Sequence, residues 1–472
     1  MRARYHPIIL ALLVQACAPV PHLGTAPVPR SASAVASQIA LPATAADWPA
    51  DRWWTALGDP QLDSLIAEGL AGSPDVAAAA ARVRGADALA QQAGAALGPS
   101  LAIDGSVGGN KQSENLGIPP AFVPKGVQDT GRITAALSFN LDLWGKNRAA
   151  LAAAISEQRA AEVEVAEARL VLSTSVALAY AELAHLYASR DVAQSTLTVR
   201  DHTVELIAGR QHQELETLAT LRQIEARQAA AQADLQAIDE RIALQKNAIA
   251  ALLGAGPDRG RAVERPAAQV SNVVGLPPQL ALDLLGRRPD IVAARLRTEA
   301  AASRIKQRSA EFYPSVNLMG VGGLMSMGLG NLFKSDASFG GAGPAISLPV
   351  FNTERLQGQL KGAHAEYNAA VAGYNAALTN AVHEVADVIT SRRALDGQLS
   401  SLRSAVASVQ QAHEMVSRRY QGGLASYLEV LSAEDTLLSA RRGLSDTESR
   451  TLALDIALAQ ALGGGFSVPQ AN

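Results

Sequence analysis

Hydrophobic and polar residues alternate along four short segments of the chain. In the segment 131–144, GRITAALSFNLDLW, the apolar side chains share one face, as Ile133 does with Leu137, and polar residues such as Thr134 occupy the other. An alternation with a period of two residues predicts a β-strand with one apolar face. Three further segments show a shorter form of this pattern: 100–108, 314–324 and 345–351. We therefore expect four strands, joined in pairs by loops at 109–130 and 325–340.

Most of the remaining chain is rich in alanine and is typical of long helices. The expected helical stretches are 62–97, 147–212, 217–253, 277–312, 354–421 and 426–462. A helix of about 67 residues is roughly 100 Å long, far more than the ~40–45 Å thickness of a bilayer. Such helices must therefore project into an aqueous space. The chain reverses direction between paired helices at 213–216 and 422–425.

The second half of the chain repeats the first. Residues 73–101 align with residues 288–316 at a shift of 215, and further on the shift falls to 209, where Thr217 matches Ser426. Each half has the same order of elements: a helix, two strands, a long helix and a shorter return helix. We therefore predict a mixed α and β fold made of two tandem homologous halves, 51–260 and 261–463, followed by a tail at 464–472.

The N-terminus has the pattern of an exported lipoprotein. An apolar run at 8–14 follows two arginines and ends shortly before Cys17, the single cysteine of the chain. We interpret residues 1–16 as a signal peptide and 17–50 as a tether lipidated at Cys17. Gln15 departs from the residue type usual in a lipoprotein signal, so an ordinary signal peptide with an incidental cysteine is the alternative. With one cysteine, no disulfide framework can form.

The apolar face of the predicted strands has to be covered. No other sheet or apolar helix face remains in the sequence to cover it, and strands of about 9–11 residues match the length of a tilted transmembrane strand. Four strands cannot close a barrel, and an open sheet edge in lipid leaves backbone groups unpaired. Transmembrane strands would therefore require an oligomer, with eight strands from two copies or twelve from three. A soluble sheet with one buried face is the alternative.

Charge and motifs give no support for catalysis or for nucleic-acid binding. The net charge is −3, from 41 basic and 44 acidic residues, without a long run of one sign. His383 and Glu384 lack the second histidine of a zinc-protease motif. The glycine-rich segment 254–260 follows a helix rather than a strand, so it fits a linker between the halves better than a nucleotide loop. We expect no enzyme activity, no cofactor and no metal site.

The second reversal, in the segment RRYQGGLASYLEV at 418–430, carries local signals of a tight turn. Gly422 and Gly423 can end a helix, because glycine adopts left-handed backbone angles readily. Ser426 and Glu429 then have the spacing of a capping box, which predicts the start of a new helix. The stretch therefore predicts a helix, a turn of a few residues and a second helix running back.

Five segments match motifs of a known family. They are DRWWTALGDPQLDSLIAEGL at 51–70, LDLWGKNR at 141–148, GLPPQLALDLLGRRPDI at 275–291, FYPSV at 312–316 and SLPVFN at 347–352. On these motifs the chain resembles the TolC/OprM-like outer-membrane factors of tripartite efflux systems, in particular their NodT-type lipoprotein branch. The similarity covers roughly residues 50–463 in order. It implies a homotrimer with a twelve-stranded β-barrel in the outer membrane and a twelve-helix α-barrel below it in the periplasm.

The resemblance also implies roles for the second reversal. The segment Gly422, Gly423, Leu424, Ala425 and Ser426 would lie at the periplasmic tip, where a periplasmic adaptor protein docks and the channel opens. Two further side chains are candidates for the pore constriction: Glu429, as one carboxylate of a ring of three, and Tyr420, which matches a tyrosine of the family's latch.

Other positions depart from the family's pattern. The latch arginine of the family aligns with Ala425, a second acidic position with Ser432, and the first-half counterpart of Glu429 is Thr220. Near the first reversal, we expect Glu214 and Glu216 to form a solvated acidic tip.

The function that the resemblance implies is a passive exit duct. It would be anchored by lipid in the outer membrane, would extend into the periplasm, and would pass drugs or other small molecules from an adaptor and an inner-membrane pump of the resistance–nodulation–division type. A type I protein-secretion duct or a metal-efflux duct would share this architecture. A periplasmic coiled-coil scaffold is the alternative from another class, but it would need sustained heptads and has no use for four alternating strands.

Overall fold

The computed structural model describes residues 20–21, 23–31, 48–113, 115, 117, 119–267, 285–349 and 351–468. The predicted signal peptide, Cys17 and much of the predicted tether lie outside the described residues, as does the first part of the predicted helix 277–312. The chain divides into two compact units. The first comprises 1–29, 82–161 and 294–374, and the second comprises 30–81, 162–293 and 375–472.

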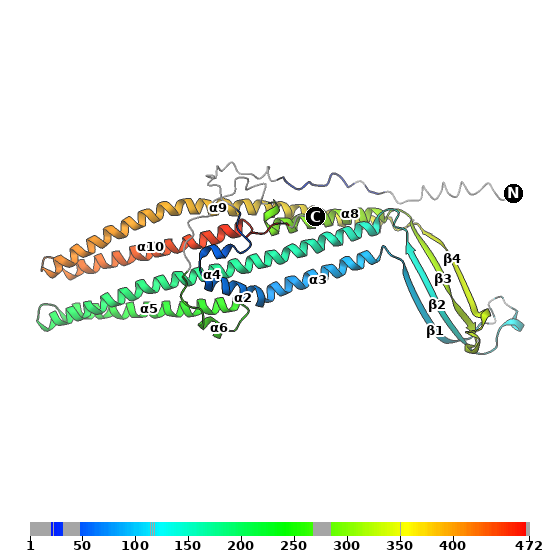
Figure 1. Ribbon diagram of the computed structural model, residues 1–472, viewed down its shortest axis with the longest axis horizontal. Coiled ribbons are helices and arrows are strands. Elements are labelled where there is room, and N and C mark those ends of the chain that lie inside the picture. Colours follow the sequence, from blue (N-terminus) through cyan, green and yellow to red (C-terminus); the bar gives the residue numbers. More distant parts are fainter. Residues whose placement is uncertain are drawn as a thin grey trace. The chain divides into compact units, whose positions relative to one another are not determined.

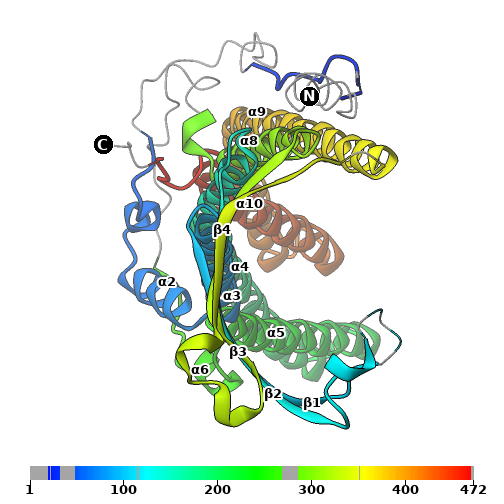
Figure 2. The same cartoon turned by 90° about the vertical axis from the view of Figure 1, so that its right-hand side faces the viewer.

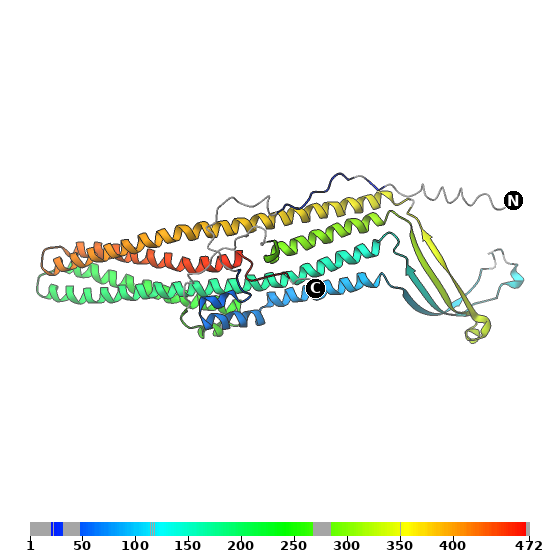
Figure 3. The ribbon, with the colours of Figure 1, turned by 45° about the horizontal axis from the view of Figure 1, so that its top comes forward.

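The first unit contains a sheet of four antiparallel strands in chain order (Figure 3). The strands are β1 (Ser100–Asn110), β2 (Gln128–Asn140), β3 (Ser315–Met327) and β4 (Ser338–Ser347). Figure 2 views the sheet edge-on, as a single curved layer. Because β2 and β3 come from different halves of the chain, the sheet joins the two sequence repeats through one continuous ladder.

Two of the predicted strands differ from the observed ones at their ends. β2 stops at Asn140 because the side chain of Asp142 accepts hydrogen bonds at 2.9 Å from the backbone N–H groups of Asn147 and Arg148, which starts the helix α4 (Lys146–His212). The prediction of a strand at 345–351 is wrong in its placement. β4 occupies Ser338–Ser347, where glycines conceal the alternation of apolar and polar residues.

The predicted apolar face of the sheet is confirmed by the strand register. Leu101 pairs with Leu137, and Val316 pairs with Ile346, so the apolar side chains of neighbouring strands stand next to one another. These side chains are exposed: the exposed fraction is 65% for Leu101 and 71% for Ile346. Among the described residues, β1 and β4 each pair with one strand only. The sheet therefore presents both an uncovered apolar face and two open edges.

The helices follow the predicted repeat, with one interruption. They are α2 (Pro60–Gly72), α3 (Pro74–Ala95), α4, α5 (Leu218–Leu252), α6 (Pro257–Arg261), α8 (Pro289–Ala310), α9 (Thr353–Gln421) and α10 (Tyr427–Ala461), with short 3-10 turns at Trp53–Leu57, Pro120–Phe122, Leu329–Asn331 and Ser335–Ala337. The single helix predicted at 62–97 is wrong, because Ser73 is extended before Pro74. The predicted linker at 254–260 contains the start of α6.

The main apolar core of the second unit lies where α2 packs against the middle of α4. The fully buried side chains Leu65, Ile66 and Leu183 belong to it, together with Trp53 and Trp54. Asp59 fixes the start of α2: its carboxylate accepts hydrogen bonds from the backbone N–H of Gln61 at 2.9 Å and from the hydroxyl of Tyr180 at 2.7 Å. The family-like motif around Trp53 and Asp59 thus builds the core.

Among the described residues, one helix, α4, has a stretch that is long and apolar enough to cross a membrane by length and composition. An 18-residue window of α4 has a mean hydropathy of 1.3, and half of the window is buried inside the protein. Leu172, Val176, Tyr180 and Leu183 of α4 all belong to the main core. The apolar stretch therefore contributes to helix packing.

A tight contact between the end of α2 and the turn that follows α5 depends on Gly254. Its φ is +71°, and a Cβ atom there would lie 2.7 Å from the carbonyl oxygen of Gly72. We expect Gly254→Ala to lower the stability by at least about 1–2 kcal/mol, the cost of the left-handed angle alone. The measurement is the apparent unfolding temperature of the purified protein in detergent. Gly256→Ala is the matched control, since Gly256 has φ −71° and nothing lies within 4 Å of the position that a Cβ atom would take there. Equal unfolding temperatures for the two variants would contradict the expectation.

A second cluster in this unit concentrates three carboxylates around one guanidinium. Arg288 bonds to Asp290 at 2.8 Å and to Glu384 at 2.6 Å, and its Nη1 also donates to the carbonyl of Ala461 at 3.1 Å. Glu167 lies in the same cluster. Burial, and next the charge of Asp290, raise the pKa of Glu167 to about 7. Glu167 therefore keeps its proton up to about pH 7 in the folded protein, whereas in the unfolded chain it loses the proton near pH 4.5.

This proton makes the stability depend on pH. Because the folded pKa is the higher one, stability falls as pH rises from about 4.5, the ordinary value for glutamate, to about 7. We expect Glu167→Gln to raise the apparent unfolding temperature at pH 8 and to change it little at pH 5. Unfolding curves at both pH values check this, with Glu182→Gln, an exposed residue on the same helix, as control. A gain of equal size at both pH values would speak against the cluster as its cause.

Candidate functional site: the paired helix reversals

Both helix reversals lie at the same end of the second unit (Figure 1). They have the same backbone geometry, 209 residues apart. The N–H of Leu215 donates to the carbonyl of Arg210 at 2.9 Å, and the N–H of Leu424 donates to the carbonyl of Arg419 at 2.8 Å. These bonds close the last turn of α4 and of α9 in the same way. The two sequence repeats therefore end in two matching turns.

The residue that turns the chain differs between the two reversals. Gly423 has φ +71°, which glycine adopts without strain. Its counterpart Glu214 has φ +59° and is the one residue other than glycine with a positive φ in the described part of the chain. A left-handed angle costs roughly 1–2 kcal/mol for a residue with a side chain. The first reversal is thus the more strained of the two.

The capping box predicted at the second reversal is confirmed. The side chain of Ser426 accepts from the N–H of Glu429, and the carboxylate of Glu429 accepts from the N–H of Ser426 at 2.9 Å. Glu429 is exposed, and its hydrogen bonds from the Ser426 backbone and side chain lower its pKa from the ordinary value. Because its pKa is lowered, Glu429 is ionised at neutral pH.

At the matching position of the first reversal, Thr217 caps α5 by accepting a hydrogen bond from the N–H of Thr220 at 3.1 Å.

Directly behind the reversals, apolar side chains from all four helices form a small core, here called the tip cluster. Its buried members are Ile207, Ile224, Tyr420, Tyr427 and Leu431. The rings of Tyr420 and Tyr427 lie 5.6 Å apart. The tip cluster packs the first hairpin, α4–α5, against the second hairpin, α9–α10.

A polar link joins the two hairpins next to the tip cluster. The hydroxyl of Tyr420 donates to Glu216 at 3.2 Å, and the guanidinium of Arg210 lies 5.2 Å from the centre of the Tyr420 ring. Arg210 also lies 4.0 Å from the same Glu216 oxygen. The expectation that Glu216 belongs to a solvated acidic tip is wrong, since its side chain is only 18% exposed. Glu214 is exposed as expected.

A second polar link lies deeper between the hairpins. Arg200 of α4, with a side chain that is 5% exposed, bonds to Glu434 at 3.2 Å and to Asp435 at 2.9 Å on α10. Arg227 of α5 bonds to Asp435 at 2.8 Å. Burial raises the pKa of Glu434, while the charge of Arg200 opposes this shift. This network was not predicted from the sequence, in which its only signal is the pair of adjacent acids Glu434 and Asp435.

The structure places the predicted tip residues in two environments. Gly422, Gly423 and Ser426 are exposed, and so is Leu424, with 74% of its surface exposed. Ala425 packs against the tip cluster. Among the described residues, no three His, Cys, Asp or Glu side chains form a group that could hold a metal ion. The reversals therefore present two exposed leucines, Leu215 and Leu424, together with the exposed acids Glu214 and Glu429.

The hydroxyl of Tyr420 is expected to hold the two hairpins together. Tyr420→Phe removes the hydrogen bond to Glu216 and should cost about 1 kcal/mol of local stability. Hydrogen exchange of the backbone amides in 205–220 should therefore become faster. Tyr374→Phe is the control, because it removes a tyrosine hydroxyl from the same helix α9, 46 residues before Tyr420. Faster exchange in both variants alike would show that the change does not come from the bond between Tyr420 and Glu216.

Comparison with known proteins gives the fold a family. The family model described as "Outer membrane efflux protein" matches residues 65–255 and 280–464. The multidrug resistance outer membrane protein MdtP of Escherichia coli (strain K12) is 31% identical over 428 residues, which are 89% of this chain and 87% of MdtP. The toluene efflux pump outer membrane protein TtgF of Pseudomonas putida is 30% identical, covering 88% of this chain and 85% of TtgF.

A solved structure agrees with these relatives. The outer membrane protein VceC of Vibrio cholerae superposes with a TM-score of 0.84 at 46% identity and covers 89% of this chain and 100% of VceC. Proteins of this kind form trimers, with a β-barrel and a helical barrel, and work in tripartite efflux systems. With its four-stranded sheet and its two long hairpins, the chain belongs to the outer membrane efflux protein family.

Proposed function

We propose that the chain is the exit duct of a tripartite efflux pump and passes drugs or other small molecules from a periplasmic adaptor to the exterior. The observation that carries this proposal is the four-stranded sheet with an exposed apolar face and two open edges, joined to helices of 67 and 69 residues. The names of the relatives, multidrug resistance and toluene efflux proteins, support small organic molecules as cargo.

Three copies account for the open sheet. With β4 of one copy beside β1 of the next, three sheets of four strands close a barrel of twelve, and every backbone edge is paired. The apolar faces, with exposed side chains such as Ile103 and Leu101, then face lipid. The long helices extend the same wall into the periplasm.

The lipid anchor at Cys17 is supported by the described part of the tether. Leu23 packs against Phe312, Leu356 and Leu360, which lie at the sheet ends of α8 and α9. Six residues of extended chain span at most about 20 Å. Cys17 would therefore lie within reach of the membrane boundary at which the strands end, as an acyl anchor requires.

The reversals serve as the periplasmic tip in this proposal. Leu424 and its counterpart Leu215 are 74% and 61% exposed at the ends of the two hairpins. A docked adaptor would bury these leucines together with Gly422, Gly423 and Ser426. The adaptor would then connect the duct to an inner-membrane pump, for which the resistance–nodulation–division type is our proposal.

Glu429 would set the charge at the constriction of this tip. Its carboxylate is exposed and ionised, and a trimer presents three of them. A ring of carboxylates attracts cations and repels anions. Tyr420 contributes indirectly, because its ring is buried in the tip cluster and its hydroxyl holds Glu216 of the other hairpin.

Single-channel recordings in planar bilayers test both the duct and the ring. Purified trimers should conduct ions, and Glu429→Gln should lower the cation preference several-fold, seen as a smaller reversal potential in a salt gradient. Thr220→Glu places an acid at the matching site of the first hairpin and should raise the preference of the channel for cations. Trimers that insert but never conduct, even when the tip is freed by Tyr420→Phe, would overturn the duct. An unchanged reversal potential in both charge variants would overturn the ring.

A further inference from the structure

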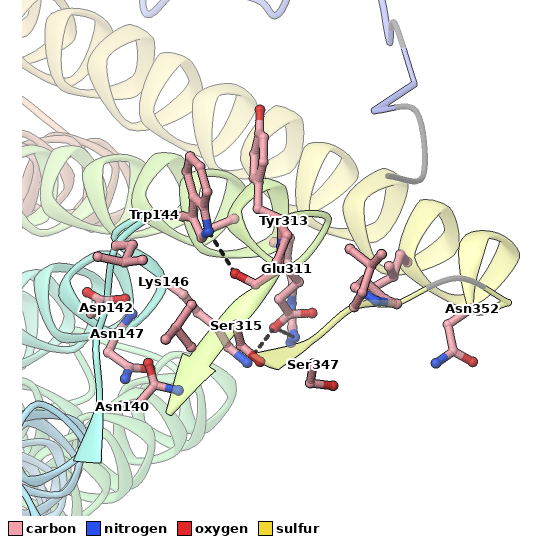
Figure 4. A pocket seen from close by; sticks show the side chains of 18 of the residues that line it. Asn140, Asp142, Trp144, Lys146, Asn147, Glu311, Tyr313, Ser315, Ser347 and Asn352 are labelled. Carbon is pink, nitrogen blue, oxygen red and sulfur yellow. Dashed lines mark hydrogen bonds and ion pairs between the residues drawn. The ribbon is translucent and has the colours of Figure 1, made fainter. Parts of the chain in front are cut away.

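A polar cavity of about 480 Å³ lies in the first unit where the strands meet the helices (Figure 4). The end of β2, the start of β3 and the end of β4 form one side of it, and the ends of α4, α8 and α9 form the other. Its charged lining residues are Asp142, Lys146, Arg308, Glu311 and Arg355. This cavity takes no part in the tip or in the proposed opening.

The charges of the cavity leave a surplus of cations. Lys146 and Arg308 share one carboxylate, with their nitrogens 3.7 Å and 3.0 Å from the same oxygen of Glu311. The carboxylate of Asp142 is occupied with capping α4 and with Arg148. Arg355 donates to the side-chain oxygen of Gln359, a neutral group of its own helix, at 2.9 Å. The cavity is therefore suited to an anion that accepts hydrogen bonds from Arg355 and Arg308.

An aromatic pair stands beside these cations. The rings of Trp144 and Tyr313 stack with centres 4.8 Å apart and planes 21° apart, and Figure 4 shows them side by side. The indole N–H of Trp144 donates to the carbonyl of Pro314 at 2.7 Å, which fixes the ring. Both rings remain partly exposed, 52% for Trp144 and 42% for Tyr313. Half-exposed Trp and Tyr are typical of the boundary between lipid tails and headgroups.

The apolar face of the sheet begins next to the cavity. Val316 and Ile346 are paired on that face at the start of β3 and the end of β4, and Leu143, which lines the cavity together with Val316, is 58% exposed. A molecule with one anionic end and long apolar chains could therefore place its charge in the cavity and its chains along the sheet. A free phosphate ion would use the cations but leave the apolar surface uncovered.

We propose that this cavity binds the phosphate of a phospholipid of the membrane leaflet on the helical side of the sheet. Arg355 and Arg308 donate to the phosphate oxygens, Trp144 and Tyr313 flank the glycerol region, and the acyl chains cover Ile346 and its neighbours. The proposal rests on the transmembrane placement of the sheet. It adds to the duct a lipid site in each copy, which fixes the depth of the junction between strands and helices.

Native mass spectrometry of the detergent-purified trimer, titrated with dioleoylphosphatidylglycerol, tests the site. Wild-type trimers should retain up to three lipids, and Arg355→Ala should weaken binding about tenfold. Lys361→Ala is the matched control: it removes an exposed cation of the same helix that does not line the cavity, and it should bind like wild type. Equal weakening in both variants would show attraction by bulk charge only and would overturn the site.

Two further measurements separate a lipid site from a site for free phosphate, and the lipid site from the duct itself. Inorganic phosphate at 100 times the lipid concentration should leave lipid binding unchanged; complete displacement would identify a site for free phosphate and overturn the lipid proposal. The same trimers are recorded in planar bilayers. Arg355→Ala trimers that conduct and bind lipid as well as wild type would overturn the lipid site and leave the duct standing.

Discussion

The open edges of the four-stranded sheet are the constraint on which the architecture depends. A strand edge presents N–H and C=O groups that cost several kcal/mol each if they stay unpaired in hydrocarbon. One copy leaves the edges of β1 and β4 open, and the exposed apolar face of the same sheet excludes water as its natural surroundings. Only closure with further copies satisfies both conditions at once. The trimeric β-barrel of the family meets this requirement, because three sheets of four strands leave no edge open.

Sequence duplication explains why the tip has two matching turns, and divergence explains how they are linked. The backbone bonds of the two reversals agree at a shift of 209 residues, but the side chains do not. Glu216 matches Ala425, and Tyr420 matches Gln211. The hydrogen bond from Tyr420 to Glu216 therefore uses one residue from each repeat that the other repeat lacks.

The sequence predicted what periodicity and local chemistry determine. The long helices, three of the four strands and the capping box at Ser426 and Glu429 followed from alternation, alanine content and residue spacing. β4 was misplaced because its glycines have no side chain to show a pattern. The half-buried state of Glu216 could not be predicted either, because it results from Tyr420, which is 204 residues away in the chain. Cys17 stays a prediction, since it lies outside the described residues.

The two polar links between the hairpins would restrict how the tip widens in the proposed opening. Removing one partner of a buried ion pair leaves an uncompensated charge, which costs far more than an exposed pair contributes. Arg200 is held by Glu434 and Asp435, so separating α4 from α10 would strand one of the most deeply buried charges in the described chain. The link from Tyr420 to Glu216 is shallower and neutral on one side. If the two hairpins of one copy moved together, both links would stay intact. If they separated from each other, the shallower link from Tyr420 to Glu216 would break before the buried links of Arg200. In the proposed opening, the exposed turn would therefore yield before the helices around the buried Arg200 separate.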